Sequence, residues 1–335
     1  MKDLDPAALD CLAALADEAS FERAAQRLSI TQSAVSQRLK SLEAQVGRLL
    51  LVRSRPLRLT EPGKVLLRFA RQMHAMRADV ARELGAASPS PERLPIAVNA
   101  DSLATWVMPA LDELVRGGLP LELVVDDQDF THDWLRQGAV LGCVSTVREA
   151  LRGCRVAPLG VMRYTAVASP EFVARELAGD PAGLNRSTFA RLPFLIFNRK
   201  DDMQEQWVSL AFGVRAPGLR ERFVPSSEAY VRAALMGWGV GVAPLVQVQG
   251  LIDAGALIPL MPDVTLEVEL FWHQWRLGPD GDESSTSRVG MLDRIGGALA
   301  AGAAKALAVG KAKREGRKGG RRTRPGTGPK SRAKP

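Results

Sequence analysis

Apolar residues recur at helical spacing through the first quarter of the chain. Over residues 5–18 they lie three or four apart, which predicts an amphipathic helix. A shorter helix is predicted over 21–28, with Ser20 as its N-cap. A third helix is predicted to start at Thr31, a second N-cap, and to end before Gly47. The buried stripe of this third helix is predicted to comprise Val35, Leu39, Leu42 and Val46.

The pattern changes after the third helix. Residues 49–60 are typical of two short strands around Arg53–Pro56, as in a β-wing. Glu61–Pro62 then opens a long helix to about Leu84, because proline is well tolerated in a first helical turn. Its apolar positions form a seam of roughly 36 Å at 1.5 Å per residue, which favours self-association over packing on its own domain. The seam is predicted to contain Leu66, Phe69, Met73, Met76, Val80 and Leu84.

Beyond a Pro/Ser-rich linker, strand and helix patterns alternate, which predicts parallel α/β sheets. The predicted strands are 95–99, 121–125, 139–145, 164–168, 194–197, 220–224, 239–243 and 266–272. The predicted helices are 102–115, 130–137, 170–178, 202–211, 227–236, 244–251 and 287–308. The expected fold is α/β: a winged helix-turn-helix (1–60), a dimerising linker helix (61–85), a hinge (86–95), two Rossmann-like lobes (96–310) and a disordered basic tail (311–335).

Charge is unevenly distributed along the 335 residues. The net charge of +8 combines +10 from residues 311–335 and +4 from residues 1–85 with −6 from the segment between them. The high isoelectric point therefore reports mainly the tail. A basic N-terminal domain followed by an acidic middle indicates a polyanionic partner for the former and another task for the latter.

Several function classes are disfavoured. No apolar run approaches the roughly 20 residues that cross a bilayer, and the acidic N-terminus lacks a signal-peptide pattern, so we expect a cytoplasmic protein without a membrane partner. No metal-ligand, Ser/His/Asp or phosphate-loop pattern stands out, so we expect neither an enzyme nor a cofactor. The cysteines and histidines are widely separated and are interpreted as ordinary core or surface residues: Cys11, Cys143, Cys154, His74, His132 and His273.

The helix that starts at Thr31 has a short, polar, acid-free outer face. Such a face suits the DNA major groove, where small donors and acceptors read base edges and nearby cations contact phosphates. Considered alone, it is more typical of a solvated helix face. Together with the tight turn and the Arg-rich wing, it predicts binding to double-stranded DNA. The predicted DNA-binding residues are Thr31, Gln32, Ser33, Ser36, Gln37, Arg38, Lys40, Arg53, Arg55 and Arg58.

The segment FERAAQRLSITQSAVSQRLKSLEAQVG resembles the LysR family of bacterial transcriptional regulators. The resemblance lies in the pair Ala24–Ala25, the helix start Thr31-Gln32-Ser33, the pair Leu42–Glu43 before Gly47, and Thr60-Glu61-Pro62-Gly63. It implies a winged helix-turn-helix, a dimerising linker helix and a periplasmic-binding-protein-like effector domain. It also implies homodimers that pair into tetramers and act on RNA polymerase.

Two further segments, AVNADSLATWVMPAL (97–111) and PSSEAYV (225–231), look like the arginine/lysine-responsive branch of that family. This branch activates a basic amino-acid exporter gene and has also been described as an inhibitor of replication initiation. The resemblance therefore implies a lysine or arginine effector. The basic tail lies outside the family pattern.

Ligands of open α/β sheets bind beyond the carboxyl ends of the strands. Two predicted helix starts with hydroxyl groups follow such ends and suit a carboxylate. Acids nearby would serve an ammonium group and a side-chain cation. Each acid considered singly is more typical of a solvated loop, but the group as a whole favours an effector site. The predicted effector-binding residues are Asn99, Asp101, Ser102, Asp126, Asp127, Asp201, Asp202, Ser226, Ser227 and Glu228.

Three other functions remain open at this point. The chain is compatible with a LysR-type regulator of another small molecule. It is also compatible with an amino-acid-binding protein or enzyme that carries an accessory DNA-binding domain, which the absent signal peptide and catalytic patterns disfavour. The third is an architectural DNA binder driven by the tail, because Lys/Arg arms bind DNA without sequence preference.

Overall fold

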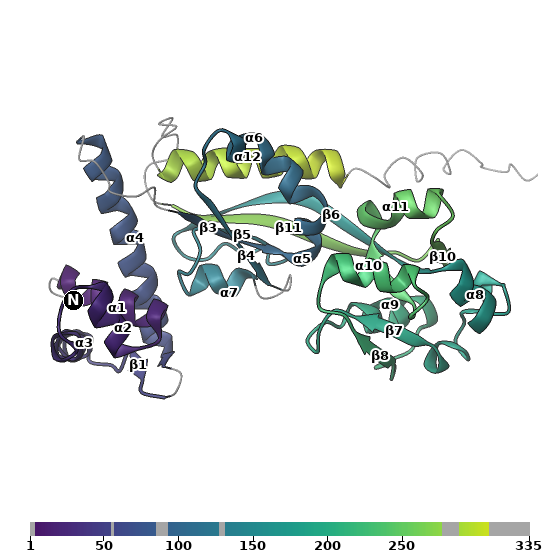
Figure 1. Ribbon diagram of the computed structural model, residues 1–335, viewed down its shortest axis with the longest axis horizontal. Coiled ribbons are helices and arrows are strands. Elements are labelled where there is room, and N and C mark those ends of the chain that lie inside the picture. Colours follow the sequence, from purple (N-terminus) through teal and green to yellow (C-terminus); the bar gives the residue numbers. More distant parts are fainter. Residues whose placement is uncertain (1–3, 55–56, 85–92, 127–130, 277–287, 308–335) are drawn as a thin grey trace, which may run out of the picture.

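The computed structural model describes residues 4–54, 57–84, 93–126, 131–276 and 288–307. A small helical head lies at the N-terminus, the long helix α4 (Glu61–Glu83) rises from it, and an elongated two-lobed domain lies beside them (Figure 1). The predicted tail and most of the predicted hinge lie outside the described residues. In the described part of the chain, no helix is long and apolar enough to span a membrane.

The head is the predicted helix-turn-helix. It is built from α1 (Pro6–Glu18), α2 (Phe21–Arg27) and α3 (Gln32–Val46). Ser20 and Thr31 act as N-caps, because each hydroxyl accepts a hydrogen bond from the backbone N–H three residues later. Gly47 ends α3 in the left-handed conformation, with φ of 72°. Val35, Leu39 and Leu42 are fully buried between the helices, and Val46 is partly buried against them.

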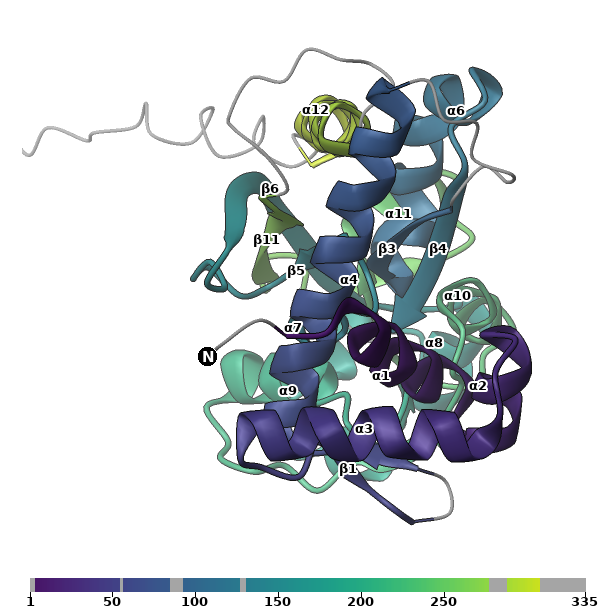
Figure 2. The same ribbon diagram turned by 90° about the vertical axis from the view of Figure 1, so that its left-hand side faces the viewer.

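A two-stranded wing follows α3, as predicted. Strands β1 (Leu51–Val52) and β2 (Arg58–Leu59) pair antiparallel. The Glu43 side chain accepts a hydrogen bond from Leu50 N at 2.9 Å, which ties the last turn of α3 to the start of the wing. Helix and wing therefore form one unit (Figure 2).

The seam predicted on α4 is corrected by the structure. Leu66 is buried, and Met73 is packed on the core of the head, because both lie on the helix face that completes the three-helix bundle. The neighbouring face is exposed and is formed by Val65, Phe69, Met76, Val80 and Leu84. A helix with two apolar faces packs one on its own domain and offers the other to a partner.

Lobe I is a twisted sheet covered by helices. Its parallel part contains β3 (Leu94–Asn99), β4 (Leu121–Asp126) and β5 (Gly142–Ser145), in the order β5-β3-β4. The covering helices are α5 (Ala100–Ser102), α6 (Met108–Arg116), α7 (Thr131–Arg136) and α12 (Arg288–Ala306). A π-helical turn, Leu103–Val107, joins α5 to α6, so the helix predicted over 102–115 is continuous but irregular.

Lobe II is smaller and lies at the far end of the domain (Figure 1). Its strands are β7 (Pro193–Ile196), β8 (Arg220–Phe223), β9 (Gly241–Pro244) and β10 (Ile258–Leu260). Its helices are α8 (Pro170–Glu176), α9 (Met203–Phe212), α10 (Ser227–Leu235) and α11 (Leu245–Asp253), with 3-10 turns at Pro181–Gly183 and Phe189–Arg191.

Two long strands connect the lobes and make the large sheet mixed, so the predicted parallel pairing holds for only part of it. Strands β6 (Cys154–Ala168) and β11 (Leu266–Trp275) pair antiparallel over most of their length. The same β6 pairs antiparallel with β9 and β10 of lobe II. Only the last third of β6, residues 164–168, was predicted, and β10 was not predicted at all, because short or partly exposed strand segments lack a distinct apolar pattern.

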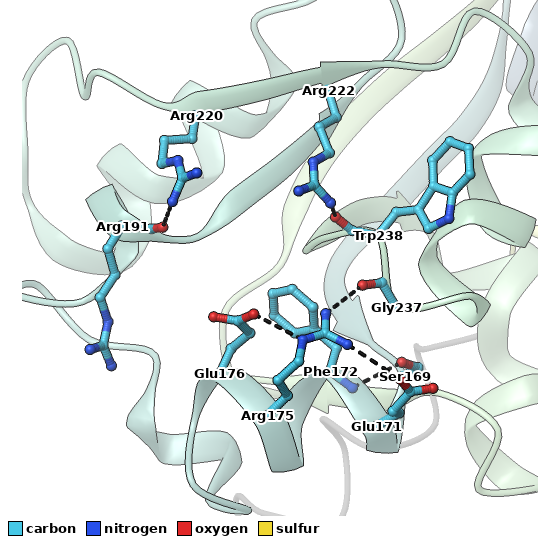
Figure 3. A network of polar contacts seen from close by, with 10 residues as sticks. All are labelled: Ser169, Glu171, Phe172, Arg175, Glu176, Arg191, Arg220, Arg222, Gly237 and Trp238. Atoms are coloured by element: carbon cyan, nitrogen blue, oxygen red, sulfur yellow. Dashed lines mark hydrogen bonds and ion pairs between the residues drawn. The ribbon is translucent and has the colours of Figure 1, made fainter.

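An arginine network fixes the far end of α10 (Figure 3). The Arg175 side chain reaches from α8 to donate to the Gly237 carbonyl at 2.9 Å and lies over the Phe172 ring. Arg222 of β8 donates to the neighbouring carbonyl of Trp238. These bonds hold the loop that ends α10 against α8 and β8.

The linker helix contacts lobe I at a glycine turn. Gly138 follows α7 with φ of 72°, and a Cβ atom there would lie 2.8 Å from the Arg68 Cα of α4. No side chain fits at that distance. The head and lobe I are therefore in contact through a site that requires glycine for both its conformation and its size.

Gly138→Asn is expected to destabilise the chain by about 1–3 kcal/mol, because asparagine tolerates positive φ but its Cβ collides with α4. Gly255→Asn is the matched control: its φ is 71°, and nothing lies within 4 Å of the added Cβ. Thermal unfolding measures both variants. Equal losses of stability would show that conformation alone, and not the contact with α4, requires Gly138.

Candidate functional site

The first candidate site is the outer face of α3. Gln32, Ser33, Gln37 and Lys40 are exposed on it, and Ser36 is half-buried. Thr31 combines its capping role with a hydrogen bond to the Ser33 hydroxyl at 2.9 Å. The described side chains on this face carry donors and acceptors without an acid, which suits base edges and phosphates.

The cations around α3 are arranged less uniformly than predicted. Arg38 is half-buried and lies near Cys11 of α1, where it lowers the pKa of the thiol against the larger, raising effect of burial. In the wing, the Arg53 guanidinium lies 5.5 Å from the centre of the Phe21 ring, while Arg58 is exposed. Arg55 lies outside the described residues.

The second candidate site is a narrow cleft between the two lobes, with a cavity volume of about 50 Å³. It opens where β3 ends in lobe I and α10 begins in lobe II. None of its described lining residues is a cation. The interlobe cleft is lined by Asn99, Ala100, Asp101, Tyr164, Phe197, Asp201, Met203, Gln204, Ser227, Tyr230, Val242, Pro244 and Gln247.

Asp101 joins the two lobes across this cleft. One carboxylate oxygen accepts from the Ser227 hydroxyl of α10 at 2.6 Å, and the other accepts from the Tyr164 hydroxyl of β6 at 2.9 Å. Burial raises the pKa of Asp101, while the two hydroxyl groups oppose that effect. The negative field of nearby Asp201 also raises it slightly.

Asp201 is held on the lobe II side. Its carboxylate accepts from Phe197 N at 2.9 Å and Met203 N at 3.1 Å, which fixes the start of α9. It also accepts from the Gln204 side-chain amide at 3.2 Å. The same amide donates to the Tyr230 hydroxyl at 3.0 Å, so α9 and α10 are joined at the cleft.

Only some of the predicted effector residues meet in the cleft. Asn99, Asp101, Asp201 and Ser227 line it, whereas four others do not. Ser102 is buried within the helix behind the cleft, and Asp202 accepts from Gln206 at 2.7 Å on the outer side of α9. Ser226 caps α10, and Glu228 is exposed. Asp127 and the side chain of Asp126 lie outside the described part.

Sequence reasoning missed the residues that complete the cleft: Tyr164, Phe197, Gln204, Tyr230 and Gln247. Tyr164 lies on a strand that passes between the lobes, and Gln204 is the second residue of α9. Neither position follows a predicted strand end. The one available signal was Tyr230, three residues after Ser227 within the segment PSSEAYV, which places both on one face of α10.

The cysteines and the histidines lie outside the interlobe cleft. All three cysteines are unoxidised and buried, and burial raises the pKa of Cys154 to about 11. His132 and His273 meet edge to face, 5.1 Å apart between ring centroids, and burial lowers the pKa of both. Among the described residues, no group of three or more His, Cys, Asp or Glu side chains could hold a metal ion.

Comparison with known proteins decides the family. Residues 6–64 match the model of the bacterial regulatory helix-turn-helix protein of the lysR family, and residues 87–280 match the LysR substrate binding domain. The chain belongs to the LysR family. It is a DNA-binding transcriptional regulator of that family and not an enzyme.

Within the LysR family the chain resembles ArgP and LysG proteins. It is 43% identical to ArgP of Aeromonas salmonicida over 83% of this chain and 92% of that protein. A crystal structure of ArgP from Mycobacterium tuberculosis superposes with a TM-score of 0.76 at 39% identity, covering 90% of this chain and 98% of the other. The structure of full-length LysG from Corynebacterium glutamicum with bound effector Arg superposes with a TM-score of 0.69 at 35% identity. It covers 90% of this chain and 99% of the other.

The raised pKa of Asp101 predicts that the stability of the folded chain depends on pH. Because its pKa is raised above the ordinary 3.8, the folded chain retains a proton that the unfolded chain releases. This contribution to stability is complete below the ordinary value and is lost as the pH rises through the raised pKa. Melting temperatures of the wild-type protein and Asp101→Asn, measured between pH 4 and 8, are expected to shift in favour of the variant with rising pH. A difference independent of pH would contradict the raised pKa.

Proposed function

We propose that this LysR-family regulator binds lysine or arginine in the interlobe cleft and, in response, changes how α3 and the wing engage an operator. The observation that carries the proposal is the lining of the cleft: Asp101 and Asp201 supply two carboxylates, and no described lining residue supplies a cation. A ligand with two positive groups satisfies both acids, and few small metabolites other than basic amino acids carry two.

The walls of the cleft suit the rest of such a ligand. Phe197, Met203 and Val242 offer apolar surface to the methylene chain of the ligand. The N-terminus of α10, a helix of nine residues capped by Ser226, offers free backbone N–H groups to its carboxylate. The bound Arg in LysG of C. glutamicum supports the same ligand class. Asp126 and Asp127 remain candidates for further contacts.

On the DNA side, the proposed contacts are the exposed side chains of α3 for bases and Lys40, Arg53, Arg55 and Arg58 for phosphates. The exposed face of α4 supports a homodimer that presents two such surfaces to a two-fold operator. We further propose that two dimers pair, and that the assembly acts on RNA polymerase and controls a basic amino-acid exporter gene. A ligand can shift this assembly only by binding one arrangement better than another.

Replacement of Asp201 tests the effector part. Asp201→Asn is expected to weaken binding of arginine and lysine at least tenfold, because it removes the charge that faces the ligand cation. Asp202→Asn, one residue away but outside the cleft, is expected to leave the affinity within about twofold. Calorimetric titration of the full-length protein measures both. Equal affinities for the two variants would remove Asp201 from the site.

Replacement of Gln37 tests the DNA part. Selection from a random DNA library first defines the preferred operator. Gln37→Ala is then expected to weaken binding to that operator about tenfold or more while leaving nonspecific binding unchanged, because a base contact carries about 1–3 kcal/mol of discrimination. Gln45→Ala, near the opposite end of α3, is the control. A matching loss on random DNA would mean that Gln37 contacts only the backbone.

A further inference from the structure

The amide of Gln204 has a fixed orientation. The side chain is buried, with 2% of its surface exposed. Both hydrogens of Nε2 have acceptors, one on Asp201 and one on the Tyr230 hydroxyl. That hydroxyl donates to the Leu195 carbonyl at 2.8 Å and accepts from Val242 N at 3.0 Å, so it is itself held in place. The Gln204 oxygen, Oε1, is consequently the atom left for the cleft.

Gln204 Oε1 is buried and has no hydrogen-bond partner among the described residues. The same is true of Asn99 Oδ1 on the opposite lobe, where Asn99 is also 2% exposed. Both residues line the interlobe cleft. An unpaired buried acceptor is costly, so two of them facing one cleft indicate a ligand that brings hydrogen-bond donors to each lobe.

Each lobe thus pairs one carboxylate with one carboxamide oxygen. Lobe I supplies Asp101 and Asn99, and lobe II supplies Asp201 and Gln204. The two pairs are held apart by α10, because Ser227 binds Asp101 and Tyr230 binds Gln204. Three residues of helix separate these anchors by about 4.5 Å along the axis. Two acidic ends held apart in this way suit a ligand that carries two separate cations.

The orientation of the ligand follows from the position of α10. Its N-terminus adjoins Asp101, and a ligand carboxylate is most stable at that helix end. The α-ammonium group is bonded to the same carbon as the carboxylate and must lie at the same end. The side-chain cation then extends toward lobe II.

We propose that Gln204 is a specificity-determining residue of this cleft: with Asp201 it binds the side-chain cation, while Asn99 and Asp101 bind the α-ammonium group. This assignment rests on the proposed function. A ligand whose side chain ends in a methyl group leaves Gln204 Oε1 unpaired. Its affinity is therefore lowered by the loss of the contact and, in addition, by the cost of the unpaired buried oxygen.

Calorimetric titration of the full-length protein with two probes tests the assignment. The probes are L-arginine and the arginine analogue that lacks only the α-amino group. Gln204→Met is expected to weaken both about ten- to hundredfold, because both retain the guanidinium. Asn99→Leu is expected to weaken arginine by a similar factor and to leave the analogue within about twofold. Gln206→Met, on the outer side of α9, is the control and is expected to change neither.

For Asn99→Leu, the comparison of the two ligands separates binding from folding, because a general loss of stability affects both ligands alike. For Gln204→Met, an unfolding midpoint well above the temperature of the titration shows that the variant is folded when its affinity is measured. The assignment is overturned if Gln204→Met weakens arginine no more than Gln206→Met does. It is also overturned if Asn99→Leu weakens both probes while Gln204→Met weakens arginine alone. That result would mean that the ligand binds in the opposite orientation, with its guanidinium at Asn99 and its α-ammonium group at Gln204. Failure of the wild-type protein to bind either arginine or lysine would instead refute the proposed function.

Discussion

The buried carboxylate of Asp101 is the interaction on which the effector domain depends. It comes from lobe I and is held by a hydroxyl of lobe II and by Tyr164 of a strand that runs through both. A buried charge is tolerated only when it is hydrogen-bonded. The lobes are therefore joined by a bond in the cleft itself, and a cation that enters the cleft interacts with the same carboxylate that joins them.

Packed secondary-structure elements connect the cleft, where such a cation binds, to the DNA-binding head. Asn99 of β3 lines the cleft and pairs in register with Asp126, so β4 ends level with β3. The Thr131 hydroxyl of α7 donates to the Val144 carbonyl of the sheet at 2.6 Å, which fixes α7 to it. Gly138, just after α7, contacts Arg68 of the linker helix. Packed elements thus connect the cleft to α4 without a gap.

The sequence predicted much of this fold, because local patterns determine much of it. Ser20 and Thr31 were recognised as caps, and the helix from Thr31 to Gly47 was predicted correctly, since each depends on neighbouring residues. The pairing of β6 with β11 depends on residues about a hundred positions apart and left no local pattern. Asp101 and Ser227 were predicted in the cleft from strand ends and helix starts. Gln204 and Tyr164 were not, because their roles depend on partners that only the folded chain brings near.

A crystal structure of the full-length protein with L-arginine tests the central claim most directly, namely that both lobes hold the two ends of a basic amino acid. The account predicts arginine in the interlobe cleft, with its guanidinium within hydrogen-bond distance of Gln204 Oε1 and Asp201 and its α-ammonium beside Asn99 and Asp101. Arginine bound outside this cleft, or bound within it without contact to Gln204 and Asp201, would contradict the account.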